Sequence, residues 1–197
     1  MFKKRVAIAL SLWLTAFVFN TRSDAQIEKV TMSLDAFLCG NECANDIQSA
    51  LKVRTEIEDL KIDHKKHQVT LFPNPKKPLD LYDIRQDLQN AGRIPWKIEV
   101  TVTGEVVDYT KVYPKEHLHS RKALKVKETD QQFILIEGEQ LDELIDFVKA
   151  GHGQVTLSGE IPAFDEKHLP VLVIKAFKEA KKEKESGTVT LAVEGLH

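Results

Sequence analysis

The sequence lacks the short motifs that mark most catalytic sites. It contains no Gly-x-Ser-x-Gly nucleophile elbow, no phosphate-binding glycine loop, no His-Glu-x-x-His zinc motif and no Cys-x-x-Cys redox motif. Its acidic residues are scattered as on a solvated surface, which does not indicate a pair of catalytic carboxylates. We therefore predict that the protein is not an enzyme.

An excess of basic charge is also missing. The chain has 28 Lys and Arg against 30 Asp and Glu, a net charge of −2. The basic residues alternate with acidic ones, as in Lys125–Glu128, and the aromatic residues are not interleaved with a basic stripe. Because binding to a phosphate backbone needs clustered Lys and Arg, we expect no nucleic-acid partner.

No apolar run is long enough to span a bilayer. The longest, Val6–Phe19, has 14 residues, whereas a transmembrane helix needs roughly 18–20. Basic residues precede this run and Ser23-Asp24-Ala25 follows it, the order of a secretory signal peptide. We predict a signal peptide over residues 1–25, export to the periplasm or secretion, and no stable membrane anchor. Residues 1–25 carry four basic side chains and one acidic, so the mature chain would have a net charge of −5.

Only two cysteines are present, Cys39 and Cys43, and they are the best functional clue in the chain. The segment Val30–Asp35 before them alternates as a half-buried strand does, and the residues after them follow helical spacing. A thiol near a helix N-terminus is favoured as thiolate. Two thiolates this close indicate a soft-metal site, a disulfide, or both in turn.

Residues 26–97 have the pattern strand, helix, strand, strand, helix, strand. The first helix is predicted at Cys43–Val53, and two strands follow at Glu56–Asp63 and His67–Phe72. A second helix has an apolar stripe from Leu81 to Ala91, with Asp80 as its cap and Gly92 beyond its end. This order predicts a ferredoxin-like βαββαβ domain.

Residues 29–98 resemble the heavy-metal-associated domain, a small copper and mercury carrier. That family places its metal cysteines between the first strand and the first helix, usually as Met-x-Cys-x-x-Cys. This sequence reads Phe37-Leu38-Cys39-Gly40-Asn41-Glu42-Cys43, with Phe in place of Met and the cysteines one residue further apart. The resemblance implies that Cys39 and Cys43 hold Cu(I) or a similar soft ion, with a protein partner for metal transfer.

The same topology would bring further residues to the cysteines. If the first two strands are parallel, the cysteine loop, the His64–His67 turn and the Gly92-Arg93 turn share one end of the domain. His64 and His67 are then candidate nitrogen ligands. The alternative is that they are solvated turn residues.

The second half of the chain has a different order: three strands, a helix and two strands. The strands are predicted at 97–107, 124–126, 132–136, 154–161 and 170–176, with the helix at 140–149. This order resembles an OB-fold, in which Gly104 and Gly159 would let strongly curved strands turn corners. We therefore predict an α+β protein: a ferredoxin-like domain at 26–97, an OB-fold-like barrel at 98–178 and a charged tail at 179–197.

Three functional hypotheses follow. The first is an exported protein that captures or carries Cu(I) through Cys39 and Cys43. The second is an extracytoplasmic module that binds a protein or a glycan, with the cysteines as a structural or redox disulfide. The third is a thiol–disulfide redox protein.

Overall fold

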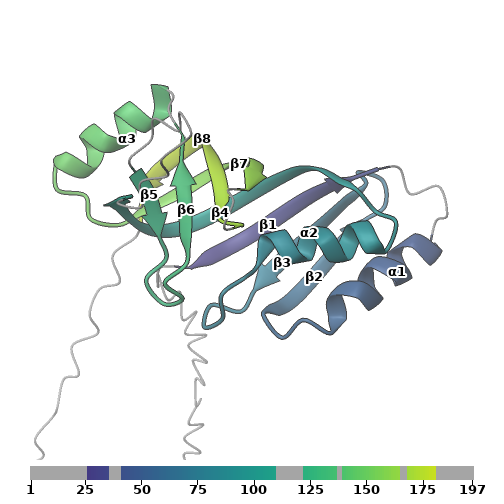
Figure 1. The fold of residues 1–197 in the computed structure, drawn as a ribbon. Helices are drawn as coiled ribbons and strands as arrows, with labels where there is room; N and C mark the ends of the chain where they lie inside the picture. The colour runs from purple at the N-terminus through teal and green to yellow at the C-terminus, as the bar shows by residue number, and fades with distance from the viewer. Residues whose placement is uncertain (1–25, 36–40, 110–121, 137–138, 165–167, 181–197) are drawn as a thin grey trace, which may run out of the picture.

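The computed structural model describes residues 26–35, 41–109, 122–136, 139–164 and 168–180, which form eight strands and three helices (Figure 1). In chain order the elements are β1 (Ile27–Leu34), α1 (Asn41–Lys52), β2 (Ile57–Asp63), β3 (Gln68–Pro73), α2 (Leu81–Asn90), β4 (Pro95–Asp108), β5 (Lys122–Lys125), β6 (Gln132–Leu135), α3 (Glu139–Lys149), β7 (Val155–Phe164) and β8 (Pro170–Glu179). None of the three helices is long and apolar enough to cross a membrane.

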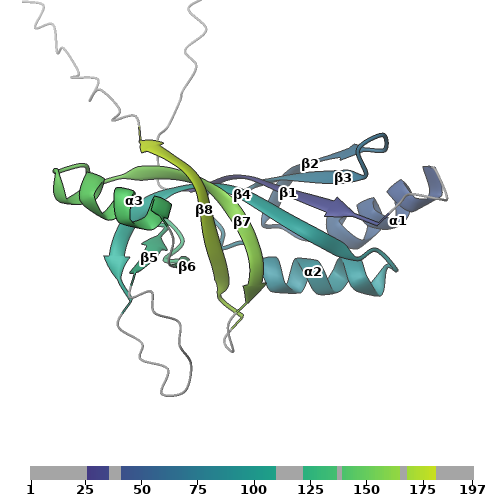
Figure 2. The same cartoon turned by 90° about the horizontal axis from the view of Figure 1, so that it is seen from above.

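All eight strands belong to one sheet, in the order β2-β3-β1-β4-β5-β6-β8-β7. Pairing of β4 with β7 closes the last five strands into a barrel. Every pairing is antiparallel except the short one between β6 and β8. The β2–β3–β1 strands extend the sheet beyond the barrel, and α1 and α2 cover one face of this extension (Figures 1 and 2).

The predicted fold class, a ferredoxin-like domain followed by a separate OB-fold-like barrel, is wrong. About half of the described residues lie in strands and about a quarter in helices, and the fold is a closed five-stranded barrel with additional strands. The described residues form no self-contained βαββαβ unit, because the 14-residue strand β4 belongs to the extension and to the barrel at once. Its first residues pair with β1, its middle with β7 and its last residues with β5.

The sequence explains why β4 continues without a break. Ile98, Val100 and Val102 are buried at alternate positions directly after the expected boundary, and the pairing of β4 with β1 runs across it, from Pro95 to Val102. The expected boundary between residues 97 and 98 therefore falls inside β4. Independent folding of the two halves stays a prediction. The expected signal peptide lies outside the described residues, as does residue 181 onward of the expected tail.

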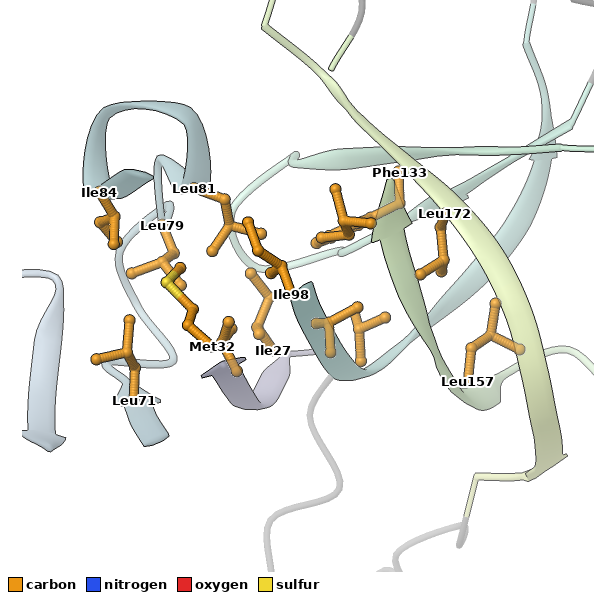
Figure 3. Packing of buried hydrophobic residues seen from close by; sticks show 14 of the residues in the cluster. Ile27, Met32, Leu71, Leu79, Leu81, Ile84, Ile98, Phe133, Leu157 and Leu172 are labelled. Atoms are coloured by element: carbon orange, nitrogen blue, oxygen red, sulfur yellow. The ribbon is translucent and has the colours of Figure 1, made fainter. Parts of the chain in front are cut away.

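The core is one contiguous cluster of buried apolar side chains that runs from the helix-covered extension into the barrel. Figure 3 shows this continuity, from Ile84 on α2 and Leu71 on β3 to Leu157 and Leu172 in the barrel. Leu79 is fully buried in the connection that leads to α2. Its main-chain N–H donates to Gln131 Oε1 (3.1 Å), and its carbonyl accepts from Gln131 Nε2 (2.6 Å). Gln131 thereby joins the barrel to the extension.

Candidate functional site

The residues predicted to surround the cysteines do lie at one end of the sheet. The Leu34 N–H, at the end of β1, donates to the His67 carbonyl in the β2–β3 turn (2.9 Å). The Leu34 carbonyl accepts from Trp96 Nε1 at the start of β4 (3.2 Å). Arg93 Nη2 lies 3.4 Å from Asp46 Oδ2 of α1. We call this region the cysteine end: residues 33–35, the first residues of α1 (41–46), the turn 64–67 and the connection 91–96.

Cys43 lies on the inner side of α1, one helical turn before Ile47. Both side chains are fully buried in the core cluster. Cys43 is disulfide-bonded. Cys39, the only other cysteine in the sequence, lies outside the described residues. A bridged and buried sulfur has no thiolate to offer a metal ion, so in this state Cys43 contributes to the stability of the fold.

The two histidines lie in the tight turn between β2 and β3. Asp63 Oδ1 accepts the N–H groups of Lys65 and Lys66 (3.0 and 3.1 Å), which fixes the turn. His64 is exposed, and His67 is half-buried with a left-handed backbone (φ 52°). Within the described residues, no group of three or more His, Cys, Asp or Glu side chains gathers as a metal site.

Ile94 and Trp96 are the functional candidates that the sequence analysis missed. Their exposed fractions are 52% and 65%. In a regular strand, residues 94, 96 and 98 would point to the same face. Because Ile98 is buried, that pattern predicts that Ile94 and Trp96 are buried too. The register explains the difference, because Ser33 pairs with Lys97 and Leu34 with Pro95, which leaves Trp96 as an extra residue in the ladder. A bulged residue of this kind is unpaired and is re-aimed, here toward solvent.

Two surface hollows lie away from the cysteine end. One, of about 240 Å³, crosses β1, β4, β7 and β8 and contains Lys29, Glu99 and Lys175. Lys175 Nζ forms ion pairs with Glu99 Oε1 (3.1 Å) and Glu160 Oε2 (2.8 Å). Hydrogen bonds to these two carboxylates raise the pKa of Lys175, and the hydrogen bond from Lys97 lowers the pKa of Glu99. Both charged forms are thus stabilised, which is the opposite of what a general acid or base needs.

The second hollow, of about 280 Å³, lies between the Pro78–Leu81 segment and His168–Pro170. The His168 ring stacks on Tyr82 with the ring centroids 3.7 Å apart. Gln131 lines this hollow, and its side-chain amide makes both hydrogen bonds to the Leu79 main chain. These contacts hold the barrel against α2, so we interpret the hollow as part of a structural junction.

Comparison with known proteins gives no family for this chain: no protein-family model matches it, and no curated protein is similar to it. The functional assignment therefore depends on the cysteine end itself. What that end presents is a buried disulfide-bonded sulfur, two histidines in a fixed turn, and two exposed apolar side chains.

Proposed function

We propose that the protein is an exported binding module, not an enzyme, that docks a partner protein through its cysteine end with Cys39 and Cys43 bridged. The observation that carries the proposal is the exposure of Trp96 and Ile94 at the same end of the sheet as the buried, disulfide-bonded Cys43. Tryptophan is among the residues that dominate binding energy at protein interfaces. Exposed apolar side chains gathered in one place indicate such an interface.

The disulfide-bonded state of Cys43 is consistent with the predicted export. Disulfides persist in oxidising compartments, which the predicted signal peptide over residues 1–25 would reach. A bridge between Cys39 and Cys43 would restrict the residues that join them, and a restricted segment loses less conformational entropy when a partner binds. The cysteines would thus act on affinity without touching the partner.

A second candidate function is capture of Cu(I) or a similar soft ion by reduced Cys39 and Cys43. It is favoured by the hydrogen bond between Leu34 and His67, which holds the histidine turn against the end of β1. His64 and His67 would supply nitrogen ligands, and metal transfer would need a protein partner. Because Cys43 is fully buried, the first turn of α1 would have to move for its sulfur to reach an ion.

The first experiment separates these two functions. Mature protein collected after export is analysed by intact mass under native conditions, with the Cys39→Ser/Cys43→Ser double variant as control. We expect wild-type protein to be lighter than its reduced form by the two hydrogens that a disulfide removes, and to carry no metal. Exported protein with free thiols and one bound copper ion, absent from the double variant, would instead establish the metal-binding function.

The second experiment tests the docking surface. A photo-crosslinking amino acid replaces Trp96 in exporting cells, and a matched probe replaces Val53, which is 79% exposed just after the opposite end of α1. We expect a partner protein to be captured at position 96 and not at 53. Trp96→Ser should then weaken binding of the purified partner at least tenfold, as loss of an anchoring residue does. Equal capture at both positions, or unchanged affinity, would contradict the proposal.

A further inference from the structure

The sheet has one open edge, and β2 forms it. Among the described residues, β2 is the only strand that pairs with a single neighbour, because closure of the barrel gives β7 two partners. Figure 2 shows β2 beside β3, at the margin of the extension. An unpaired strand presents a row of main-chain donors and acceptors to any strand that fits it.

The hydrogen bonds of β2 show which groups face this edge. Leu60 N–H donates to the side chain of Asp59 (2.9 Å) and so points away from β3. In an antiparallel strand the N–H and C=O of one residue face the same side, so the Leu60 carbonyl also faces the open edge. Asp59 and Lys61 are exposed on one face of the sheet, whereas Leu60 and Ile62 are half-buried on the other.

We propose that β2 pairs with β2 of a second copy of this chain, antiparallel and centred on Leu60. In that register Leu60 lies opposite Leu60 of the second copy and exchanges two main-chain hydrogen bonds with it. Asp59 lies opposite Lys61 of the second copy, and Lys61 opposite its Asp59. The pairing therefore forms two ion pairs on the open face. The Leu60 N–H then leaves the Asp59 side chain and donates to the Leu60 carbonyl of the second copy.

The charges select this register against its neighbours. A shift of two residues in one direction places Asp59 opposite Asp59, and a shift in the other places Lys61 opposite Lys61. Like charges directly opposite each other destabilise a sheet. A shift of one residue turns the half-buried Leu60 and Ile62 against the charged face of the second copy. The sequence Asp59-Leu-Lys61 is thus complementary to itself in the register centred on Leu60, as a two-fold interface requires.

A charge-exchange experiment tests the proposal. Sedimentation velocity of the mature chain is measured over a concentration series for wild type, Asp59→Lys, Lys61→Asp and the variant with both substitutions. We expect wild type to dimerise, each single variant to dimerise at least tenfold more weakly, and the exchanged variant to regain the wild-type affinity. Higher salt should weaken the wild-type dimer, because the ion pairs are exposed.

Matched controls make the result specific to β2. Asp142→Lys on α3 and Lys127→Asp after β5 make the same charge changes at exposed positions, and neither should alter the dimer. Circular dichroism confirms that each variant is folded. A wild-type chain that stays monomeric, or a dimer that none of the β2 variants weakens, would overturn the proposal. If deletion of residues 181–197 abolished the dimer and the β2 variants did not weaken it, the dimer interface would belong to the C-terminal segment instead.

Discussion

At the scale of single residues, two glycines decide whether the barrel can close. A Cβ added at Gly104 would meet the main-chain carbonyl of Lys125, and one added at Gly159 would meet that of Val173. Both neighbours are backbone atoms of adjacent strands, which cannot move aside as a flexible side chain can. The sequence analysis predicted a role for these glycines in strand curvature. The structure gives the physical reason: β5 lies close against Gly104 of β4, and β8 lies close against Gly159 of β7.

We expect Gly104→Ala and Gly159→Ala each to lower the free energy of unfolding by about 1–3 kcal/mol, the usual effect of forcing an extra methyl group into a packed site. Urea denaturation measures this loss. Gly153→Ala is the matched control, because a Cβ there meets nothing within 4 Å, and it should change stability by less than about 0.5 kcal/mol. Equal stability of all three variants would mean that the strands separate easily at these points.

At the scale of elements, local signals in the sequence were reliable. Asp80 caps α2 by accepting the Asp83 N–H (2.9 Å), and Gly92 follows the helix with φ 73°, both as predicted. Most predicted strands and helices lie within a few residues of the observed ones, because alternation and helical spacing report directly on which side chains are buried. Trp96 was missed because a bulge depends on the partner strand, which no local pattern contains.

Arg54 joins three of these elements. It follows α1 and hydrogen-bonds Glu56, just before β2 (2.9 Å), and Asp87 of α2 (2.6 Å). Partial burial by itself would raise the pKa of Glu56, but hydrogen bonds from Arg54 and the main chain, together with the charges of Arg54 and Lys77, lower that pKa. Because the folded-state pKa is lowered, the stabilisation is present above the unfolded-state value and is lost as the pH falls through the folded-state value.

We therefore expect Arg54→Gln to lower the free energy of unfolding by about 1–2 kcal/mol at neutral pH. The difference from wild type should shrink as the pH falls below the ordinary range of a Glu carboxyl and through the lowered pKa of Glu56 in the folded wild-type protein. Urea denaturation at several pH values measures this convergence. Lys52→Gln, which removes a nearby charge in the last turn of α1, should cause a much smaller loss at neutral pH. A difference for Arg54→Gln that is constant across the acid range would exclude the Glu56 bond as its source.

At the scale of the whole molecule, the sequence was a poorer guide. The order of elements was predicted, but the fold class was wrong because β4 serves the extension and the barrel together. Local patterns show that a strand is buried on one face; they do not show how many partners share its edges. That the end of β1, the His64–His67 turn and Arg93 share one end of the sheet was predictable, since it depends only on strand direction. The exposed Trp96 beside them was not.

Gln131 tests how strongly the two parts of the molecule depend on each other. Gln131→Ala removes both hydrogen bonds to the Leu79 main chain and leaves its buried N–H and C=O groups unpaired. We expect a loss of about 1–3 kcal/mol in the free energy of unfolding, with faster hydrogen exchange at the Leu79 amide. Gln132→Ala, at the neighbouring half-buried position, should change neither quantity appreciably. Unchanged stability in Gln131→Ala would favour halves that fold independently.

The closure of the barrel by β4 and β7 has a consequence for how far self-association can go. A sheet with two open edges can add copies without limit, as fibrils do, whereas this sheet has a single open edge among its described residues. Once a strand from a second copy occupies β2, each copy has used the one open edge that its described residues present. The association that we propose is therefore self-terminating. A concentrated solution should reach a plateau at two chains per particle and show no further rise in light scattering.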